Sequence, residues 1–144
     1  MFGSFSKPTA AYEQVGIASD VASADPHRLI LLLFEGAAAA LKNAAFAMEQ
    51  GDIPAKGKAI SKAISIINDG LLASLDVKAG GELAERLYSL YEYMVSRLLW
   101  ANLKNDRVVL DEVARLLEEI HSAWRAIKPK PDGSLPTPEE TQEA

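Results

Sequence analysis

Cysteine is missing from this sequence of 144 residues, and histidine occurs only twice. Without thiols the chain can form no disulfide bond, no thiolate metal site and no cysteine nucleophile. The absence of cysteine also fits a reducing compartment, and we expect the protein to be cytoplasmic.

Positive charge and long apolar runs are also scarce. The chain has 15 Lys and Arg against 20 Asp and Glu, for a net charge of −5. Nucleic-acid phosphates require clustered basic residues, so no nucleic-acid partner is expected.

The longest apolar run, Leu29 to Phe34, is far shorter than the roughly 20 residues of a membrane span. Residues 1–11 lack the plan of a signal peptide. We therefore predict a soluble protein without membrane insertion.

The sequence shows little of the apolar and polar alternation of half-buried strands, but it is rich in helix boundaries. Asp25-Pro26 is a helix start, with an N-cap residue followed by proline in the first turn. Gly51 can take the left-handed conformation that ends this helix at about Gln50. Further helices are predicted over about 54–73, 81–104 and 106–127, with Gly80-Gly81 as the turn before the third.

Four long helices joined by short turns predict an all-α fold, an antiparallel four-helix bundle over residues 25–128. The hydrophobic share of 49% is enough for a substantial core. Residues 1–24 are expected to form an N-terminal arm with a short helix, and residues 129–144 a disordered acidic tail.

Two of the predicted helices carry more apolar residues than one core-facing stripe requires. In the third helix Leu83, Leu87, Leu90, Met94 and Leu98 form the expected core face. Other apolar residues lie off the core face when each residue is advanced by about 100° around the axis. These off-face residues of the first and third helices are Leu31, Leu32, Tyr88, Tyr93, Val95, Leu99 and Trp100.

Such helices are either buried on two sides by neighbours or leave an apolar groove exposed. Only two other long helices are available to cover both of them, which favours the groove. Exposed apolar patches usually mark binding sites. We therefore predict that the off-face residues line a groove for an amphipathic segment of a partner protein.

Catalytic and metal-binding chemistry finds little support in the sequence. Glu118 and His121 have the Glu-x-x-His spacing of di-iron bundles, but those sites need a second such motif and further carboxylates. We expect this pair to be solvated on the polar face of its helix. Asp76 is interpreted as a cap or turn residue. No enzyme activity, metal site or cofactor is predicted.

Several segments of the sequence form a recognisable pattern when they are taken together. They are Tyr12, Ala24-Asp25-Pro26-His27-Arg28-Leu29-Ile30, Gly80-Gly81-Glu82-Leu83-Ala84 with Leu87-Tyr88-Ser89-Leu90-Tyr91-Glu92-Tyr93-Met94, and Ala101-Asn102 and Ala123-Trp124. This pattern resembles the FliS family of flagellar secretion chaperones. It covers about residues 12–127. The chain departs from the usual pattern at Asp25 and Phe34, where the family often has Ser and Tyr.

The resemblance implies a cytoplasmic helical bundle that binds the C-terminal segment of flagellin, prevents its premature polymerisation and assists its delivery to the flagellar type III export apparatus. The implied partners are flagellin, in a one-to-one complex with a monomeric chaperone, and an export gate protein. We further expect Tyr12, Val15 and Ile17 of the arm to cover the groove while no client is bound. The alternative is a non-enzymatic adaptor or a homodimeric structural bundle that buries the extra apolar faces against itself.

Overall fold

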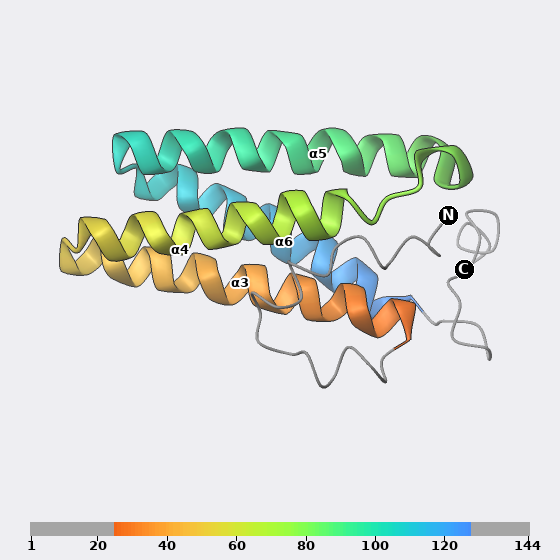
Figure 1. Cartoon of the computed structure of the whole chain (residues 1–144), viewed down its shortest axis with the longest axis horizontal. Helices are drawn as coiled ribbons and strands as arrows, with labels where there is room; N and C mark the ends of the chain where they lie inside the picture. The colour runs from red at the N-terminus through yellow and green to blue at the C-terminus, as the bar shows by residue number, and fades with distance from the viewer. Residues whose placement is uncertain (1–24, 128–144) are drawn as a thin grey trace.

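Four long helices, each antiparallel to the next along the chain, form a bundle in a computed structural model that describes residues 25–127 (Figure 1). The elements are α3 (Pro26–Gln50), α4 (Ile53–Ser65), the π-helix η2 (Ile66–Leu72) that continues α4, α5 (Val77–Lys104) and α6 (Arg107–Ala126). Helix α4 packs against both α3 and α5, and α6 packs against the other sides of the same two helices. Consequently α3 and α5 lie diagonally across the bundle. The all-α bundle predicted from the sequence is confirmed.

An aspartate caps the N-terminus of each long helix. The carboxylates of Asp25, Asp52, Asp76 and Asp106 each accept a hydrogen bond from the backbone N–H three residues later, at 2.8 to 3.1 Å. Each such cap stabilises its helix by about 1 kcal/mol. At the other ends, Gly51 and Asn105 adopt left-handed backbone conformations. The predicted boundaries of the first helix and the capping role of Asp76 are therefore confirmed.

The second predicted helix contains a π-helical segment that the sequence pattern did not reveal. A regular α-helix would place Ile66 outside the core face, yet Ile66 is completely buried. The wider turn of η2 accommodates an additional residue and rotates the following side chains around the axis. Both Ile66 and Ile67 consequently face the core.

Helix α5 begins earlier than predicted and breaks at Gly81. Its first turn starts at Val77, and Gly81 then takes φ 57° and ψ −138°, which are not helical values. Residues with a Cβ atom rarely adopt this conformation. Leu83, which lies just after this break and was expected in the core, is 52% exposed. The predicted core position of Leu83 is wrong, and Ala84 is buried instead.

The core is formed by apolar side chains from every element. Its completely buried large members include Leu33, Phe34, Ile60, Leu71, Met94, Leu98, Val113 and Leu117. Helix α3 is long and apolar enough to cross a membrane, with a mean hydropathy of 1.6 over its best window. Half of that window is buried inside the bundle, as expected for a central helix of a helical core.

Both histidines are buried where α3 meets α6. The Nε2 atom of His27 lies 2.7 Å from the carbonyl oxygen of Trp124, and the indole N–H of Trp124 donates to the carbonyl of His27 at 3.1 Å. The two rings also stack. These contacts join the start of α3 to the end of α6.

The expectation that His121 is solvated on the polar face is wrong. His121 is only 6% exposed and stacks on Phe34 with ring centroids 5.3 Å apart. It follows Leu117 by one helical turn, which places it on the core side of α6. Glu118 remains mostly exposed and forms an ion pair with Arg125.

Candidate functional site

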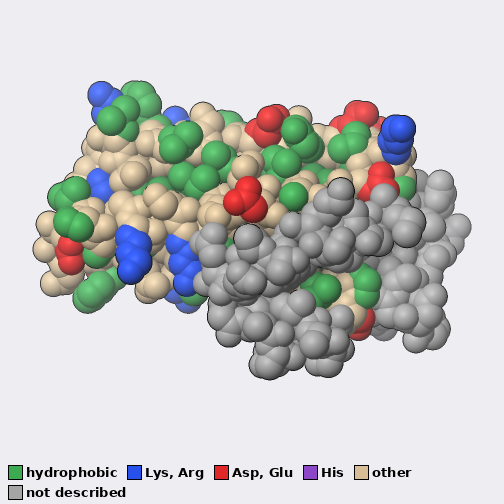
Figure 2. Space-filling view, viewed as in Figure 1, with side chains coloured by type: hydrophobic (Ala, Val, Ile, Leu, Met, Phe, Trp, Pro, Cys, Tyr) green, Lys and Arg blue, Asp and Glu red, His purple; other side chains and the backbone are tan. Residues whose placement is uncertain are grey.

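Exposed apolar side chains are concentrated on α5. Hydrophobic side chains extend over the upper part of the molecule in Figure 2, where α5 lies. The exposed large apolar residues of this helix are Val77, Leu83, Tyr88, Tyr93, Leu99, Trp100 and Leu103. In the regular part of α5 they lie on two sides of the core face, one toward α4 and the other toward α6.

The first of these sides, the α4-side flank, consists of Tyr88, Val95, Leu99 and Leu103. It lies beside α4 because Asn102, which shares this side of the helix, accepts a hydrogen bond at its carbonyl from Nζ of Lys56 at 2.8 Å. Tyr88 is 38% exposed, Leu99 57% and Leu103 77%, whereas Val95 is half-buried against the core. The flank is therefore a predominantly apolar surface along the seam between α4 and α5.

The second side, the α6-side flank, consists of Tyr93, Arg97 and Trp100. The hydroxyl of Tyr93 donates to Glu112 of α6 at 2.7 Å, and Nε of Arg97 donates to the same carboxylate at 3.2 Å. The ammonium group of Lys104 lies 5.4 Å from the ring centroid of Trp100, a cation–π contact. Polar and charged groups of the chain itself thus engage this flank.

The pKa values of the Tyr93 hydroxyl and the Glu112 carboxyl are shifted by the same contacts. The hydrogen bond from Tyr93, together with that from Arg97, holds the pKa of Glu112 below its usual value. The neighbouring carboxylate in turn raises the pKa of the Tyr93 hydroxyl. The protonated tyrosine and the ionised glutamate therefore stabilise each other at neutral pH.

The structure does not bring all seven predicted groove residues together. Tyr88, Val95 and Leu99 share one flank of α5, whereas Tyr93 and Trp100 share the other. Leu31 is half-buried on α3, diagonally opposite α5, and Leu32 is buried although it does not belong to the core cluster. The predicted groove thus corresponds to three separate surfaces. The covering residues predicted in the arm, Tyr12, Val15 and Ile17, lie outside the described residues.

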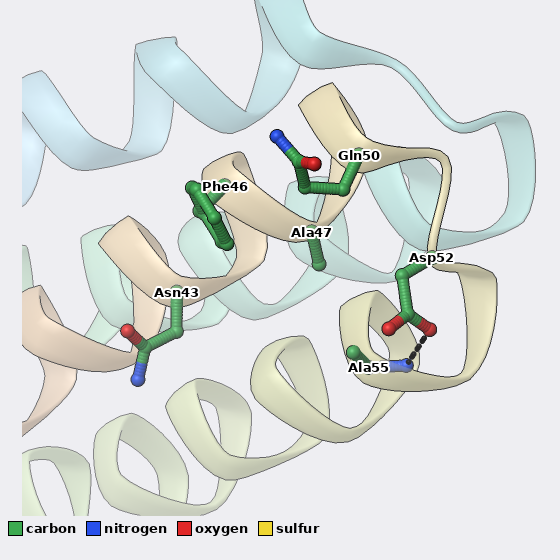
Figure 3. Close-up of a pocket in the computed structure, with 6 residues that line it drawn as sticks. All are labelled: Asn43, Phe46, Ala47, Gln50, Asp52 and Ala55. Carbon is green, nitrogen blue, oxygen red and sulfur yellow. Dashed lines mark hydrogen bonds between the residues drawn. The ribbon is translucent and has the colours of Figure 1, made fainter.

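Six exposed large apolar residues among those described were not part of the predicted site: Phe46, Ile53, Val77, Leu83, Leu103 and Val108. Two of them bear on the site. Leu103 extends the α4-side flank one turn beyond Leu99, and its helical spacing was a usable signal. Phe46 of α3 is 63% exposed and borders a hollow of about 250 Å³ between α3 and α4 (Figure 3). The residues lining this hollow are Asn43, Phe46, Ala47, Gln50, Asp52 and Ala55.

The exposed apolar surface of α5 is suited to binding another helix. Within residues 25–127 no three His, Asp or Glu side chains converge as metal ligands would. The α4-side flank instead offers aliphatic and aromatic area with the spacing of helical turns. An amphipathic helix can bury its apolar face on such a surface.

Comparison with known proteins gives a consistent result. The family model for the flagellar protein FliS matches residues 8–131. The chain is 54% identical over 120 residues to the flagellar secretion chaperone FliS of Salmonella typhimurium, covering 83% of this chain and 89% of that protein. The chain is 50% identical over 121 residues to the flagellar secretion chaperone FliSB of Pseudomonas aeruginosa, covering 84% of this chain and 95% of that protein. The FliS chaperone of Bacillus subtilis is 32% identical over 118 residues, covering 82% and 84%.

Proposed function

The chain belongs to the FliS family of flagellar proteins, and we propose that it is a cytoplasmic export chaperone for flagellin. In this proposal it binds the C-terminal segment of newly made flagellin, prevents premature polymerisation and assists delivery to the flagellar type III export apparatus. Its role is non-enzymatic. Similarity to the Salmonella and Pseudomonas secretion chaperones over most of the chain supports the assignment.

The observation that carries the proposal is the exposed α4-side flank of α5. Leu99 and Leu103 are each more than half exposed, although a soluble bundle gains free energy by burying such residues. Tyr88 adds aromatic area, which binds at a low cost in side-chain entropy. We propose that this flank is the main contact for the flagellin segment.

A client segment that folds on binding must offset its own ordering, at about 2–5 kcal/mol or more. The contact therefore has to be extensive. Because α3 and α5 lie diagonally across the bundle, one straight client helix cannot reach both Leu31 and Leu99. We propose that the flagellin segment passes around the bundle. Its main contact is the α4-side flank, and Tyr93, Trp100, Leu31 and Leu32 provide secondary contacts.

The N-terminal arm is proposed as a weak cover for this surface in the absence of client. Tyr12, Val15 and Ile17 are the proposed anchors, and any free energy that holds the arm in place is subtracted from the client affinity. Hydrogen exchange tests this idea, because protection across residues 12–19 should fall when flagellin binds. Equal protection with and without flagellin would contradict it.

Co-purification with flagellin tests the function itself. We expect a one-to-one complex with full-length flagellin and none with flagellin lacking its C-terminal segment. Leu99→Ala should weaken the complex. Val108→Ala is the matched control, because Val108 is 78% exposed and lies on α6, the helix diagonally opposite α4. Equal retention of truncated and full-length flagellin would contradict the proposal.

A homodimer is the competing explanation for the same flank, because a second copy could bury it equally well. Light scattering separates the two cases. A chaperone should be monomeric at micromolar concentration and shift to the mass of a one-to-one complex with flagellin. An obligate dimer that does not dissociate in the presence of flagellin would favour the adaptor or structural bundle. Binding of the complex to an export gate protein is a further proposed step.

A further inference from the structure

A single carboxamide interrupts the apolar α4-side flank of α5. When residues are advanced by about 100° around the axis, Asn102 falls between the buried Leu98 and the exposed Leu99. We propose that Asn102 pairs with an Asn or Gln side chain of the client helix and so fixes the register in which that helix binds. This inference rests on the proposed function of the α4-side flank.

The side chain of Asn102 is half-buried at the seam with α4. Its backbone carbonyl accepts a hydrogen bond from Nζ of Lys56, but its side-chain amide forms no hydrogen bond with another residue of 25–127. The amide is not used to cap α5 either, because the backbone N–H of Asn105 bonds to the carbonyl of Ala101 at that end. The carboxamide therefore offers donor and acceptor groups to a ligand.

Glycine faces this carboxamide from α4. A Cβ atom added at Gly57 would lie 3.9 Å from Oδ1 of Asn102, an ordinary van der Waals distance, and would meet nothing closer. Gly57 lies inside α4 and does not have a positive φ. Alanine would therefore fit the fold and favour the helix. Glycine is not required by this packing, but it benefits a client, because no side chain at position 57 stands between the client and the amide.

A client helix on the α4-side flank would cover Asn102 together with its apolar neighbours. A covered amide without a partner loses its hydrogen bonds to water, and this loss opposes binding. An apolar client residue at this place would leave the amide unpaired. A client carboxamide can both donate to Oδ1 and accept from Nδ2, so it satisfies both groups of Asn102.

A carboxylate is a poorer partner for this position. It can accept from the amide N–H groups, but it leaves Oδ1 unpaired and must itself give up its hydration. The nearby cation is Lys56, whose side chain is engaged with the carbonyl of Asn102 and which is only 3% exposed. Its ammonium group is therefore poorly placed to compensate for a client carboxylate.

The same requirement fixes the register. Tyr88, Val95, Leu99 and Leu103 follow one another along α5, so a client helix could slide by one turn and still bury apolar area. Only one register places the client carboxamide next to Asn102. A single buried asparagine in the apolar seam of a coiled coil specifies register in this way.

A double-mutant cycle between chaperone and client provides the test. Each Asn and Gln of the flagellin C-terminal segment is replaced by Leu in turn. Calorimetry measures the affinity of every peptide for the native chain and for Asn102→Leu. We expect Asn102→Leu to weaken binding of the native segment by about tenfold, because the client amide is then buried without a partner. At one client position, the combined change should weaken binding about tenfold less than the product of the two single losses.

Asn43→Leu is the matched control, because Asn43 is an exposed asparagine of α3. It should couple to no client position. Thermal melting checks that Asn102→Leu is folded, and Asn102→Ala replaces it in the cycle if it is not. Independent losses at every client position would overturn the inference, as would tight binding of a segment without Asn or Gln. The proposed function would still stand in both cases if Leu99→Ala weakens binding. If the native segment does not bind, the proposed function fails and this inference fails with it.

Substitution of Gly57 tests access to the amide separately. Gly57→Leu should weaken binding of the flagellin segment several-fold without lowering the melting temperature. Ala55→Leu adds the same kind of side chain to the other side of α4, where Ala55 lines the hollow with α3, and should leave the affinity unchanged (Figure 3). Equal affinities for Gly57→Leu and the native chain would contradict the proposed access to Asn102.

Discussion

Both flanks of α5 carry exposed apolar side chains, but these side chains have different partners. On the α6 side, Tyr93 donates to Glu112 and Trp100 lies against the Lys104 ammonium group. On the α4 side, Leu99 and Leu103 have purely aliphatic side chains that are 57% and 77% exposed. By their exposed fractions alone, 46% and 57%, Trp100 and Leu99 would be similar candidates for binding residues. Their partners indicate that the α4-side flank gains more from a client, because less existing interaction must be displaced.

The largest effect should come from comparing neighbours in the sequence, Leu98 and Leu99. Leu98 is completely buried and Leu99 is 57% exposed. Leu98→Ala should lower the free energy of unfolding by about 2–5 kcal/mol through lost burial and a cavity. Leu99→Ala should change it by no more than about 0.5 kcal/mol. Urea denaturation measures both values, and equal losses would mean that the α4-side flank belongs to the core.

Substitutions on the α4-side flank should weaken client binding more than substitutions on the α6-side flank. Leu99→Ala or Tyr88→Ala should weaken binding of the flagellin C-terminal segment by about 1–3 kcal/mol, the range for interface anchors. Trp100→Ala should cost less than about 1 kcal/mol, since its ring already contacts Lys104. Calorimetry with the same flagellin segment gives all three values. A larger loss at Trp100 than at Leu99 would reverse the proposed order.

Gly81 affects both flanks because the regular part of α5 starts after it. Gly81→Ala should reduce stability by about 1–3 kcal/mol, the range for a non-glycine residue held in a disfavoured backbone conformation. Gly51→Ala is a useful comparison, because its left-handed backbone lies at a helix end remote from this break. Thermal unfolding measures both. An unchanged melting temperature for Gly81→Ala would mean that the stability of the fold does not depend on the break in α5.

The smallest effect concerns pH and the α6-side flank. Glu112 has a folded-state pKa below 4.5, so its contribution to stability is present above pH 4.5 and is lost as pH falls through the lowered pKa. The Tyr93 hydroxyl has a raised pKa, so its contribution is present below pH 10 and is lost as pH rises through the raised pKa. Tyr93→Phe should move the pKa of Glu112 upward in an NMR titration. An unchanged pKa would show that the hydrogen bond does not form in solution.

The bundle was predictable because its boundaries are local signals. Asp25 with Pro26, and Gly51 at the other end, define α3 from sequence alone. The π-helix was not predictable in this way, because Ile66 faces the core only through an additional residue in one turn. His121 was misjudged as polar surface although its spacing of four residues from Leu117 indicates the core side of α6; its stacking partner, Phe34 of another helix, comes from tertiary packing.

The candidate site was only partly predictable for a similar reason. Helical phase identifies Tyr88, Val95 and Leu99 as residues beside the core face, but it cannot show which neighbouring helix stands next to them. It also cannot show that Tyr93 has a partner on α6, which separates the two flanks. Leu31 and Leu99 were grouped in the sequence, yet tertiary packing places their helices diagonally across the bundle.

Methyl NMR of the full chain titrated with the flagellin C-terminal segment tests the central claim most directly. Binding on the α4-side flank predicts that the methyl signals of Val95, Leu99 and Leu103 shift on addition of the segment. The methyl signals of Val108, exposed on α6, should stay in place. Unchanged signals from Val95 and Leu99 during saturating binding would contradict the assignment of this flank as the flagellin-binding surface.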